Sequence, residues 1–157
     1  YIPIVLLEDG LSVRYAGWVT GIYLFGGMLG NYSGGWLADQ TQNGRLVIFL
    51  AMVGTILPLW FGVPAVGVLQ MVLFFIAGFG SSMPHSVLVL LIQSFFPRGR
   101  GFASGLALGG MFFTGSVVSF IVGSLADVWG LTLTLQLIAI LPVIAAASAF
   151  FIPKPEQ

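Results

Sequence analysis

The charged residues of this chain are so sparse that they leave four long uncharged runs between them. The runs are residues 15–38, 46–97, 101–126 and 128–153, which hold 24, 52, 26 and 26 residues. A helix needs about 20 apolar residues to cross the hydrocarbon core of a bilayer. Helices also satisfy their own backbone hydrogen bonds, which lipid cannot do. The runs therefore predict one, two, one and one membrane crossings.

The composition supports a membrane protein and excludes several other classes. Only 6% of the residues are charged and 58% are hydrophobic, whereas soluble domains carry about 25% charged residues. The chain has no cysteine, so disulfides and thiolate metal sites are ruled out. Its formal net charge is zero, which argues against a nucleic-acid partner.

The predicted fold is one all-α polytopic membrane domain over residues 1–157. Its first residues, "YIPIVLLEDG", read as the end of a helix, so we expect the sequence to be a fragment of a longer protein. Prolines at several segment edges mark where helices stop or start. The expected helices are a partial one at 1–7 and full crossings at 15–37, 46–62, 65–92, 101–125 and 132–152.

The basic residues predict how the domain is oriented. Alternating crossings place four of the five basic residues on one side, namely Arg45, Arg98, Arg100 and Lys154, and only Arg14 on the other. Cytoplasmic loops of membrane proteins are enriched in Lys and Arg. We therefore expect that side, together with the carboxy terminus, to face the cytoplasm at a plasma (inner) membrane.

Two hydrophobic segments carry nearly the same phrase. "GWVTGIYLFGGMLG" at 17–30 and "GFASGLALGGMFFTG" at 101–115 share their glycine, aromatic and Gly-Gly-Met pattern. The segments are three crossings apart, so they cross the membrane in opposite directions. Inverted three-helix repeats of this kind are typical of secondary transporters. The alternative is that two glycine-rich helices match by chance.

The glycines of these two segments are candidates for helix packing. Helices in lipid associate largely through close backbone approach, which small residues permit. On an ideal helix the small residues of each segment gather on one face. That arrangement predicts either static packing or a smooth surface along which a neighbouring helix can move. The predicted packing residues are Gly17, Gly21, Gly27, Gly101, Gly105 and Gly115.

Three stretches of the sequence carry a family resemblance. "GGWLADQTQNGR" at 34–45 resembles the loop motif between the second and third helices in each half of the major facilitator superfamily. Gly35, Asp39, Gly44 and Arg45 match the motif, although Gln40 replaces its usual basic residue and two extra residues precede Gly44. "LLIQSFFPRGRGFASGLALGG" and "GSLADVWG" are similar to the fosmidomycin-resistance type of drug exporter.

This resemblance implies a function and a partner. It implies that the chain is the carboxy-terminal half of a transporter whose amino-terminal half, six more helices, lies across a central cavity. The two halves would rock to give alternating access to a small organic solute or drug, driven by protons or another gradient and without a cofactor. The loop residues matching the motif would belong to the conformational switch. The alternatives are a receptor or scaffold that keeps the fold without transporting, and a half-transporter that works as a dimer.

Polar residues inside the predicted crossings are the candidates for substrate contacts. His85 is the ionisable residue among them, and ionisable groups within a membrane are usually functional. The alternative is a neutral histidine bonded to a serine or a carbonyl. One histidine without an intramembrane carboxylate provides neither a catalytic pair nor a metal site, so we expect no enzyme. The remaining polar candidates are Ser81, Ser82, Gln70, Tyr23, Asn31 and Thr114, and the aromatic Phe112 beside Thr114 is a further candidate.

Overall fold

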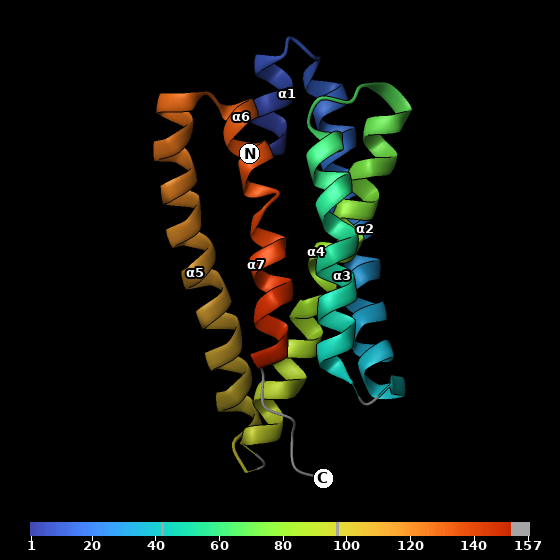
Figure 1. The fold of residues 1–157 in the computed structure, drawn as a ribbon, viewed down its shortest axis with the longest axis vertical. Helices are drawn as coiled ribbons and strands as arrows, with labels where there is room; N and C mark the ends of the chain where they lie inside the picture. The colour runs from blue at the N-terminus through green and yellow to red at the C-terminus, as the bar shows by residue number, and fades with distance from the viewer. Residues whose placement is uncertain (42, 97, 152–157) are drawn as a thin grey trace.

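The computed structural model describes residues 1–41, 43–96 and 98–151, and the described residues form helices and turns without any strand (Figure 1). This confirms the prediction of an all-α chain. The helices are α1 (Ile2–Glu8), α2 (Val13–Thr41), α3 (Gly44–Gly62), α4 (Gly67–Phe95), α5 (Arg100–Trp129), α6 (Leu131–Ile138), α7 (Leu141–Ser148) and the 3₁₀ segment η1 (Ala149–Phe151).

The last predicted crossing, 132–152, is not one continuous helix. It divides into α6, α7 and η1, while residue 152 lies outside the described residues. Pro142 stands in the first turn of α7. A proline has no backbone N–H and its ring clashes with the carbonyl four residues earlier, so the helix breaks just before it. Pro58 and Pro84 are buried inside α3 and α4, which continue through them.

Four helical stretches are long and apolar enough to cross a bilayer. They are α3, α4, α5 and the stretch Leu131–Phe151. Helix α2 has 29 residues, which is ample length, but its glycines, tyrosines and Asn31 lower its mean hydropathy. A fifth crossing through α2 therefore remains a prediction, as does the inverted-repeat arrangement of the bundle.

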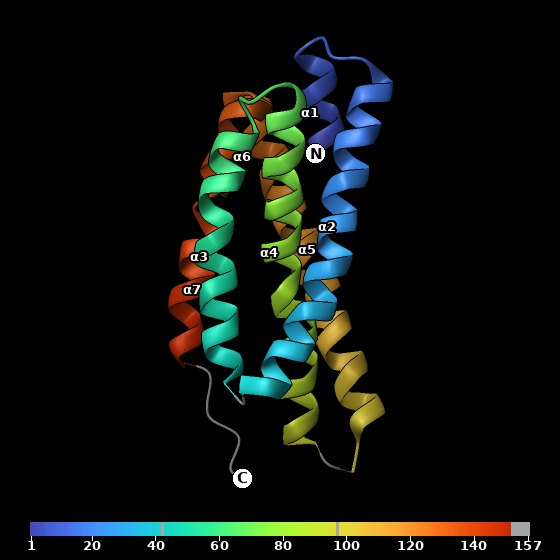
Figure 2. The same ribbon diagram turned by 90° about the vertical axis from the view of Figure 1, so that its right-hand side faces the viewer.

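The helices alternate in direction along the long axis of the molecule (Figures 1 and 2). Helices α2 and α4 run parallel, from the end of the molecule that carries α1 to the opposite end, whereas α3 and α5 run back. The α2–α3 and α4–α5 connections thus lie at one end. Arg45, Arg98 and Arg100 belong to those connections or to the helix turns beside them. The described basic residues that the sequence assigns to one side therefore share one end.

Helices α2 and α4 are the most closely packed pair of helices among the described residues. Gly26, Gly30 and Gly34 on α2 lie against the backbone of Phe75, Phe79 and Met83 on α4. Both sets are spaced by four residues, so each glycine meets the α4 backbone one turn below the last. Gly78 on α4 meets the Tyr23 backbone in return. A methyl group at any of these glycines would overlap a carbonyl oxygen, so only glycine allows this approach. We call Gly26, Gly30 and Gly34 the α2 glycine ladder.

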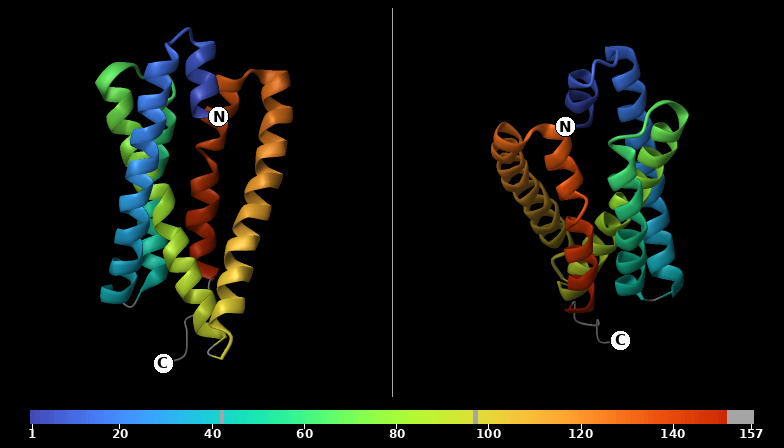
Figure 3. Two further views of the ribbon diagram at one scale, coloured as in Figure 1. Left: turned by 180° about the vertical axis from the view of Figure 1, so that it is seen from behind. Right: turned by 45° about the horizontal axis from the view of Figure 1, so that its top comes forward.

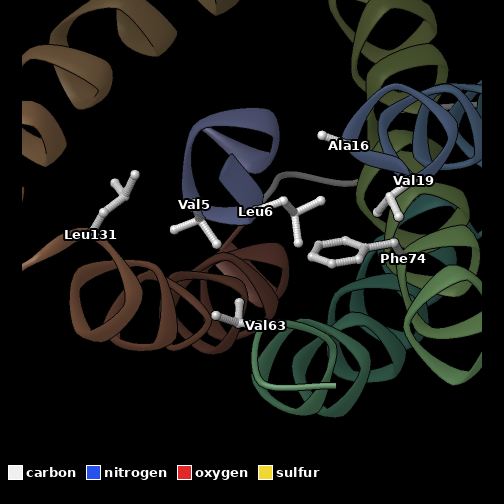
Figure 4. Close-up of a cluster of buried hydrophobic side chains, with 7 residues drawn as sticks. All are labelled: Val5, Leu6, Ala16, Val19, Val63, Phe74 and Leu131. Atoms are coloured by element: carbon white, nitrogen blue, oxygen red, sulfur yellow. The ribbon is translucent and has the colours of Figure 1, made fainter. Parts of the chain in front are cut away.

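Two clusters of buried apolar side chains tie the remaining helices to this pair. One cluster, at the α1 end, joins α1, α2, α4, α6 and the turn after α3 (Figure 4). The other joins α3, α4, α7 and η1 at the opposite end, through residues such as Ile48, Val87 and Ala146. The members of the first cluster are Val5, Leu6, Ala16, Val19, Val63, Phe74 and Leu131.

Helix α5 is the least covered of the long helices. Its buried residues are Ala103, Ala107 and Val122, and Figure 3 shows it standing apart from α2 along most of its length. It meets α4 near the connection between them, where the Gln93 side-chain amide donates to the Ser104 hydroxyl at 2.7 Å. Farther along α5, the Tyr1 hydroxyl donates to the Ser119 carbonyl at 2.6 Å. Most of the α5 surface therefore has no cover from the described residues.

Candidate functional site

An open pocket of about 300 Å³ lies between α2 and α4, beside the glycine ladder. Its α2 wall is a stripe of residues that recur about every four positions, so they share one helix face. Its α4 wall contributes two residues spaced by three. The lining residues are Tyr23, Leu24, Gly27, Met28, Asn31, Ser82 and His85. The pocket thus combines four polar side chains with two apolar ones.

The Tyr23 hydroxyl contacts α4 through Ser81. The Ser81 hydroxyl can donate to the Gly78 carbonyl at 3.2 Å. The Tyr23 and Ser81 hydroxyl oxygens lie 3.2 Å apart, and either hydroxyl can donate across this contact. The contact ties the Tyr23 side chain to α4 at the pocket.

Gly27 controls where the Ser82 hydroxyl lies. A Cβ at Gly27 would come within 2.7 Å of the Ser82 hydroxyl oxygen. An alanine here would force Ser82 to move, so glycine is what lets this hydroxyl reach the α2 wall. One turn farther along, the Ser86 hydroxyl donates to the Asn31 backbone carbonyl at 2.7 Å. This bond fixes the backbone of Asn31 against α4 and leaves its side-chain amide at the pocket.

Three polar side chains at the pocket make no side-chain hydrogen bond and can donate or accept toward a ligand. No side-chain hydrogen bond among the described residues engages the Asn31 amide, the Ser82 hydroxyl or the His85 imidazole, whereas their neighbours Ser81 and Ser86 are bonded. No acidic or permanently charged side chain lines the pocket. The described residues also contain no group of three His, Asp or Glu side chains that could hold a metal ion.

The predicted substrate-contact residues fall into three groups in space. Tyr23, Asn31, Ser82 and His85 come together at the pocket, and Ser81 supports it through Tyr23. Phe112 and Thr114 lie exposed on α5 and do not line the pocket. Gln70, the remaining candidate, is buried at the α1 end of the bundle, away from both groups.

Gln70 serves the packing of the α1 end of the bundle. Its side chain is only 1% exposed. The Tyr15 hydroxyl donates to its carbonyl oxygen at 2.8 Å, and its amide donates to the Gly62 carbonyl at 3.2 Å. With both ends of the amide bonded, Gln70 fastens α2 and the α3–α4 turn to α4 and does not reach the pocket. A polar residue in an apolar segment cannot be assigned to a pocket or to packing from sequence alone.

The Major Facilitator Superfamily model matches residues 1–157, which is the whole chain. The chain belongs to the major facilitator superfamily. Membership in this family places it among membrane transporters and not among enzymes. The chain is thus part of an integral membrane protein, in agreement with its apolar helices.

Two curated relatives accompany this match. The uncharacterized MFS-type transporter YfnC of Bacillus subtilis (strain 168) is 32% identical over 152 residues, covering 94% of this chain and 36% of the relative. The 4-hydroxybenzoate transporter PcaK of Acinetobacter baylyi (strain ATCC 33305 / BD413 / ADP1) is 27% identical over 158 residues, covering 97% and 34%. The chain spans about a third of the length of these relatives. No solved structure matches it.

The loop residues that resemble the superfamily motif lie at the junction of α2 and α3. Asp39 is exposed in the last turn of α2, and Arg45 is half-buried at the start of α3. The Asn43 side chain caps α3 by accepting from the Leu46 N–H at 3.4 Å. Gly44 packs on α4, since a Cβ there would come within 2.7 Å of a Val87 methyl. Gly35 faces Ser86 with ordinary contact distances.

The predicted packing glycines differ in their surroundings. Gly27 is buried against α4, as described above. The other five are exposed, and a Cβ at any of them would meet no other atom of the structure within 4 Å. They are Gly17, Gly21, Gly101, Gly105 and Gly115. Their role as a contact surface stays a prediction. The close helix–helix contact in the structure is made instead by the α2 glycine ladder, whose residues were not among the predicted packing glycines.

A second hollow, of about 340 Å³, lies between α2, α3 and α4 toward the end that carries Arg45. Its walls are apolar and include Leu37, Leu50 and Phe79. Its residues come from three helices and follow no short motif, so no sequence pattern indicates it.

Proposed function

We propose that this chain is the carboxy-terminal half of a secondary active transporter that moves a small organic solute by alternating access. The support is the family membership, together with a pocket that collects polar side chains from two long, otherwise apolar helices. The single observation that carries the proposal is this convergence of Tyr23, Asn31, Ser82 and His85. Polar groups are expensive inside a bilayer, so a cluster of them around a hollow favours a binding role.

In this proposal the substrate binds at the α2–α4 pocket and is enclosed by the amino-terminal half, which supplies the opposite wall. The glycine ladder holds the two helices that line the pocket as one unit. That unit can tilt as a body when the halves rock, so the binding groups keep their mutual arrangement during transport. Exposed glycines on α2 and α5 would form the contact along which the other half moves.

The charge distribution supports a proposal for the orientation and the coupling. Arg45, Arg98 and Arg100 share one end of the described structure, and we assign that end, with the carboxy terminus, to the cytoplasmic face of the plasma (inner) membrane. No Asp or Glu stands in the middle of a long helix. Proton coupling through a carboxylate would therefore use a residue of the other half.

The transported class is a small organic solute or drug. The relative PcaK is named for 4-hydroxybenzoate, and the stretches around "PRGRGFASG" resemble the fosmidomycin-resistance type of exporter. Efflux in exchange for protons is the direction that the second resemblance favours. Both solutes are suitable first probes because they are small and polar.

The test is flux through the full-length protein in proteoliposomes with an imposed pH gradient. We expect gradient-driven movement of 4-hydroxybenzoate or fosmidomycin, and a loss of about tenfold or more when His85→Ala or Asn31→Ala removes a polar contact to the solute. Ser148→Ala is the matched control, because that exposed hydroxyl on α7 bonds only the Ala145 carbonyl of its own helix.

Two results would contradict the proposal. Unchanged flux in both pocket variants, at equal protein content, would remove the pocket from the pathway. Absence of gradient-driven flux for any solute, in a protein that still binds one of them, would favour the receptor or scaffold alternative.

A further inference from the structure

We propose that the junction of α4 and α5 binds the headgroup of an anionic phospholipid. The inference goes beyond the proposed function, because it concerns a lipid and needs neither a transported solute nor a direction of transport. The site is a surface of three aromatic and two basic residues around the end of α4 and the start of α5. This basic–aromatic patch consists of Phe95, Phe96, Arg98, Arg100 and Phe102.

The lengths of α4 and α5 place their junction outside the hydrocarbon core of the bilayer. The two helices have 29 and 30 residues, and their helix rise gives them lengths of about 43 and 45 Å. The hydrocarbon core is about 30 Å thick, and the bilayer with its headgroup layers about 40–45 Å. Figure 2 shows the end of α4 and the start of α5 extending beyond the ends of α2 and α3. The patch therefore lies at the depth of the lipid headgroups.

The patch carries positive charge without an acidic residue beside it. Arg98 and Arg100 are both exposed. The sequence has no Asp or Glu between Asp39 and Asp127. Asp39 belongs to the last turn of α2, and Asp127 lies at the opposite end of α5. An arginine guanidinium binds phosphate oxygens through parallel N–H donors, so two neighbouring arginines suit the phosphate of a lipid headgroup.

The phenylalanines of the patch suit the acyl side of the same lipid. Phe95 is 49% exposed and Phe102 is 67% exposed, and the rings of Phe96 and Phe102 pack edge to face with their centroids 5.9 Å apart. Exposed apolar patches mark surfaces that contact a partner or a membrane. Aromatic rings beside basic residues are typical of protein surfaces at the boundary between headgroups and acyl chains. The combination therefore favours a phospholipid over a soluble anion.

Hydrogen bonds hold the patch in one arrangement. The Gly99 N–H donates to the Phe96 carbonyl at 3.0 Å, which closes the turn that carries Arg98. The Ser104 hydroxyl donates to the Arg100 carbonyl at 2.9 Å and accepts from the Gln93 amide of α4 at 2.7 Å. The two arginines are thus fixed between the two helices. A headgroup that contacts both of them would also hold α5, which has little other cover, against α4.

The test compares two lipids that differ in headgroup charge. Purified full-length protein in a nonionic detergent is titrated with phosphatidylglycerol or with phosphatidylcholine of the same acyl chains. Binding is followed by native mass spectrometry and by the unfolding temperature. We expect phosphatidylglycerol to bind at least about tenfold more tightly, since each basic residue near an anionic surface contributes about fivefold. Added salt should reduce this preference. Equal binding of the two lipids overturns the inference.

Variants that each remove one charge locate the site. Arg98→Gln and Arg100→Gln should each weaken phosphatidylglycerol about fivefold. Arg14→Gln is the matched control, because it removes the same charge from an exposed position at the α1 end, and it should leave lipid binding unchanged. All three side chains are exposed, so the unfolding temperatures without added lipid should agree. Equal weakening by the control, or no weakening by either patch variant, overturns the assignment.

The aromatic part of the patch has its own test. Phe102→Ala should weaken phosphatidylglycerol about threefold or more, because it removes apolar contact with the acyl chains. Phe120→Ala is the control, since that phenylalanine is also exposed on α5 but lies far from the arginines. Equal effects of the two substitutions would contradict the role of Phe102. Inorganic phosphate should not displace the lipid at equal concentration, and displacement would assign the arginines to a soluble anion and overturn the inference.

The outcomes separate this inference from the proposed function. Preference for phosphatidylglycerol that depends on Arg98 and Arg100, without gradient-driven flux of any solute, would support the lipid site and contradict transport. Gradient-driven flux in a protein that binds the two lipids equally would support transport and overturn the lipid site.

Discussion

Helices α2 and α5 contain nearly the same glycine pattern, but the glycines of the two helices have different surroundings. Gly26, Gly30 and Gly34 on α2 meet the α4 backbone so closely that no side chain fits between them. Gly101, Gly105 and Gly109 on α5 have the same four-residue spacing, yet a Cβ at any of them would meet open space. The comparison shows that glycine spacing reports the ability of a helix to approach a partner but does not identify the partner.

The surroundings of the two sets explain the difference. The α2 ladder faces the parallel helix α4, and carbonyl oxygens of α4 point at its glycines. Such contacts permit weak Cα–H···O hydrogen bonds and extensive van der Waals contact, the forces available in lipid. The α5 set stands among exposed large side chains such as Phe102 and Leu106. We interpret this exposed α5 surface as a contact surface for a partner outside the described residues.

The largest expected effect comes from breaking the α2 ladder. Gly30→Ala would place a methyl group on the Phe79 carbonyl, and because both sides are helix backbone neither can move aside alone. We expect a loss of about 3 kcal/mol or more in stability, the upper range for overpacking. The measurement is the midpoint of thermal unfolding of the purified protein in detergent.

Gly17→Ala is the control for this prediction. It lies on the same helix, is exposed, and has open space where the new methyl would go. Alanine favours a helix over glycine by about 1 kcal/mol, so this variant should unfold at an equal or higher temperature. Equal destabilisation by the two substitutions would mean that the ladder contact is not what holds α2 to α4.

The second prediction concerns the exposed glycines. Gly105→Leu on α5 and Gly21→Leu on α2 add bulk where the structure leaves space, so membrane insertion and the unfolding temperature should stay nearly unchanged. If these faces contact the other half during rocking, both variants should lose most gradient-driven flux in proteoliposomes. Normal flux in both would assign the two faces to lipid and leave the α2 ladder as the functional glycine contact.

Much of the fold was predictable because charges and prolines are costly within apolar helices. The runs between charged residues predicted the long helices to within a few residues, for example 101–125 against Arg100–Trp129. The break before Pro142 was not predicted, because a proline inside an apolar run does not always break the helix. Pro58 and Pro84, for example, lie in continuous helices. Whether a proline interrupts a helix depends on what its neighbours pack against, and that is not a local property.

The candidate site was predictable in part for a similar reason. His85, Ser82, Asn31 and Tyr23 stand out as polar residues in apolar segments, and the structure places them around one pocket. Gln70 stands out equally but is buried by packing. The difference depends on which carbonyls and hydroxyls the fold brings within reach, here Gly62 and Tyr15. Such partners come from other helices, so no pattern within one segment reveals them.

The smallest expected effect concerns the bond that holds α5 to α4. The Gln93 amide donates to the Ser104 hydroxyl at 2.7 Å, whereas α2 is held to α4 along most of their length. Gln93→Leu should therefore cost only about 1 kcal/mol, the usual range for one interhelical hydrogen bond. A double-mutant cycle with Ser104→Ala, read from unfolding midpoints, should give a coupling energy of similar size.

Ser94→Ala is the control, because that exposed hydroxyl bonds only the Leu91 carbonyl of its own helix. A coupling energy of zero would show that α5 is positioned by its connection to α4 and its small apolar contacts, and the contrast with α2 would then be larger than the structure indicates.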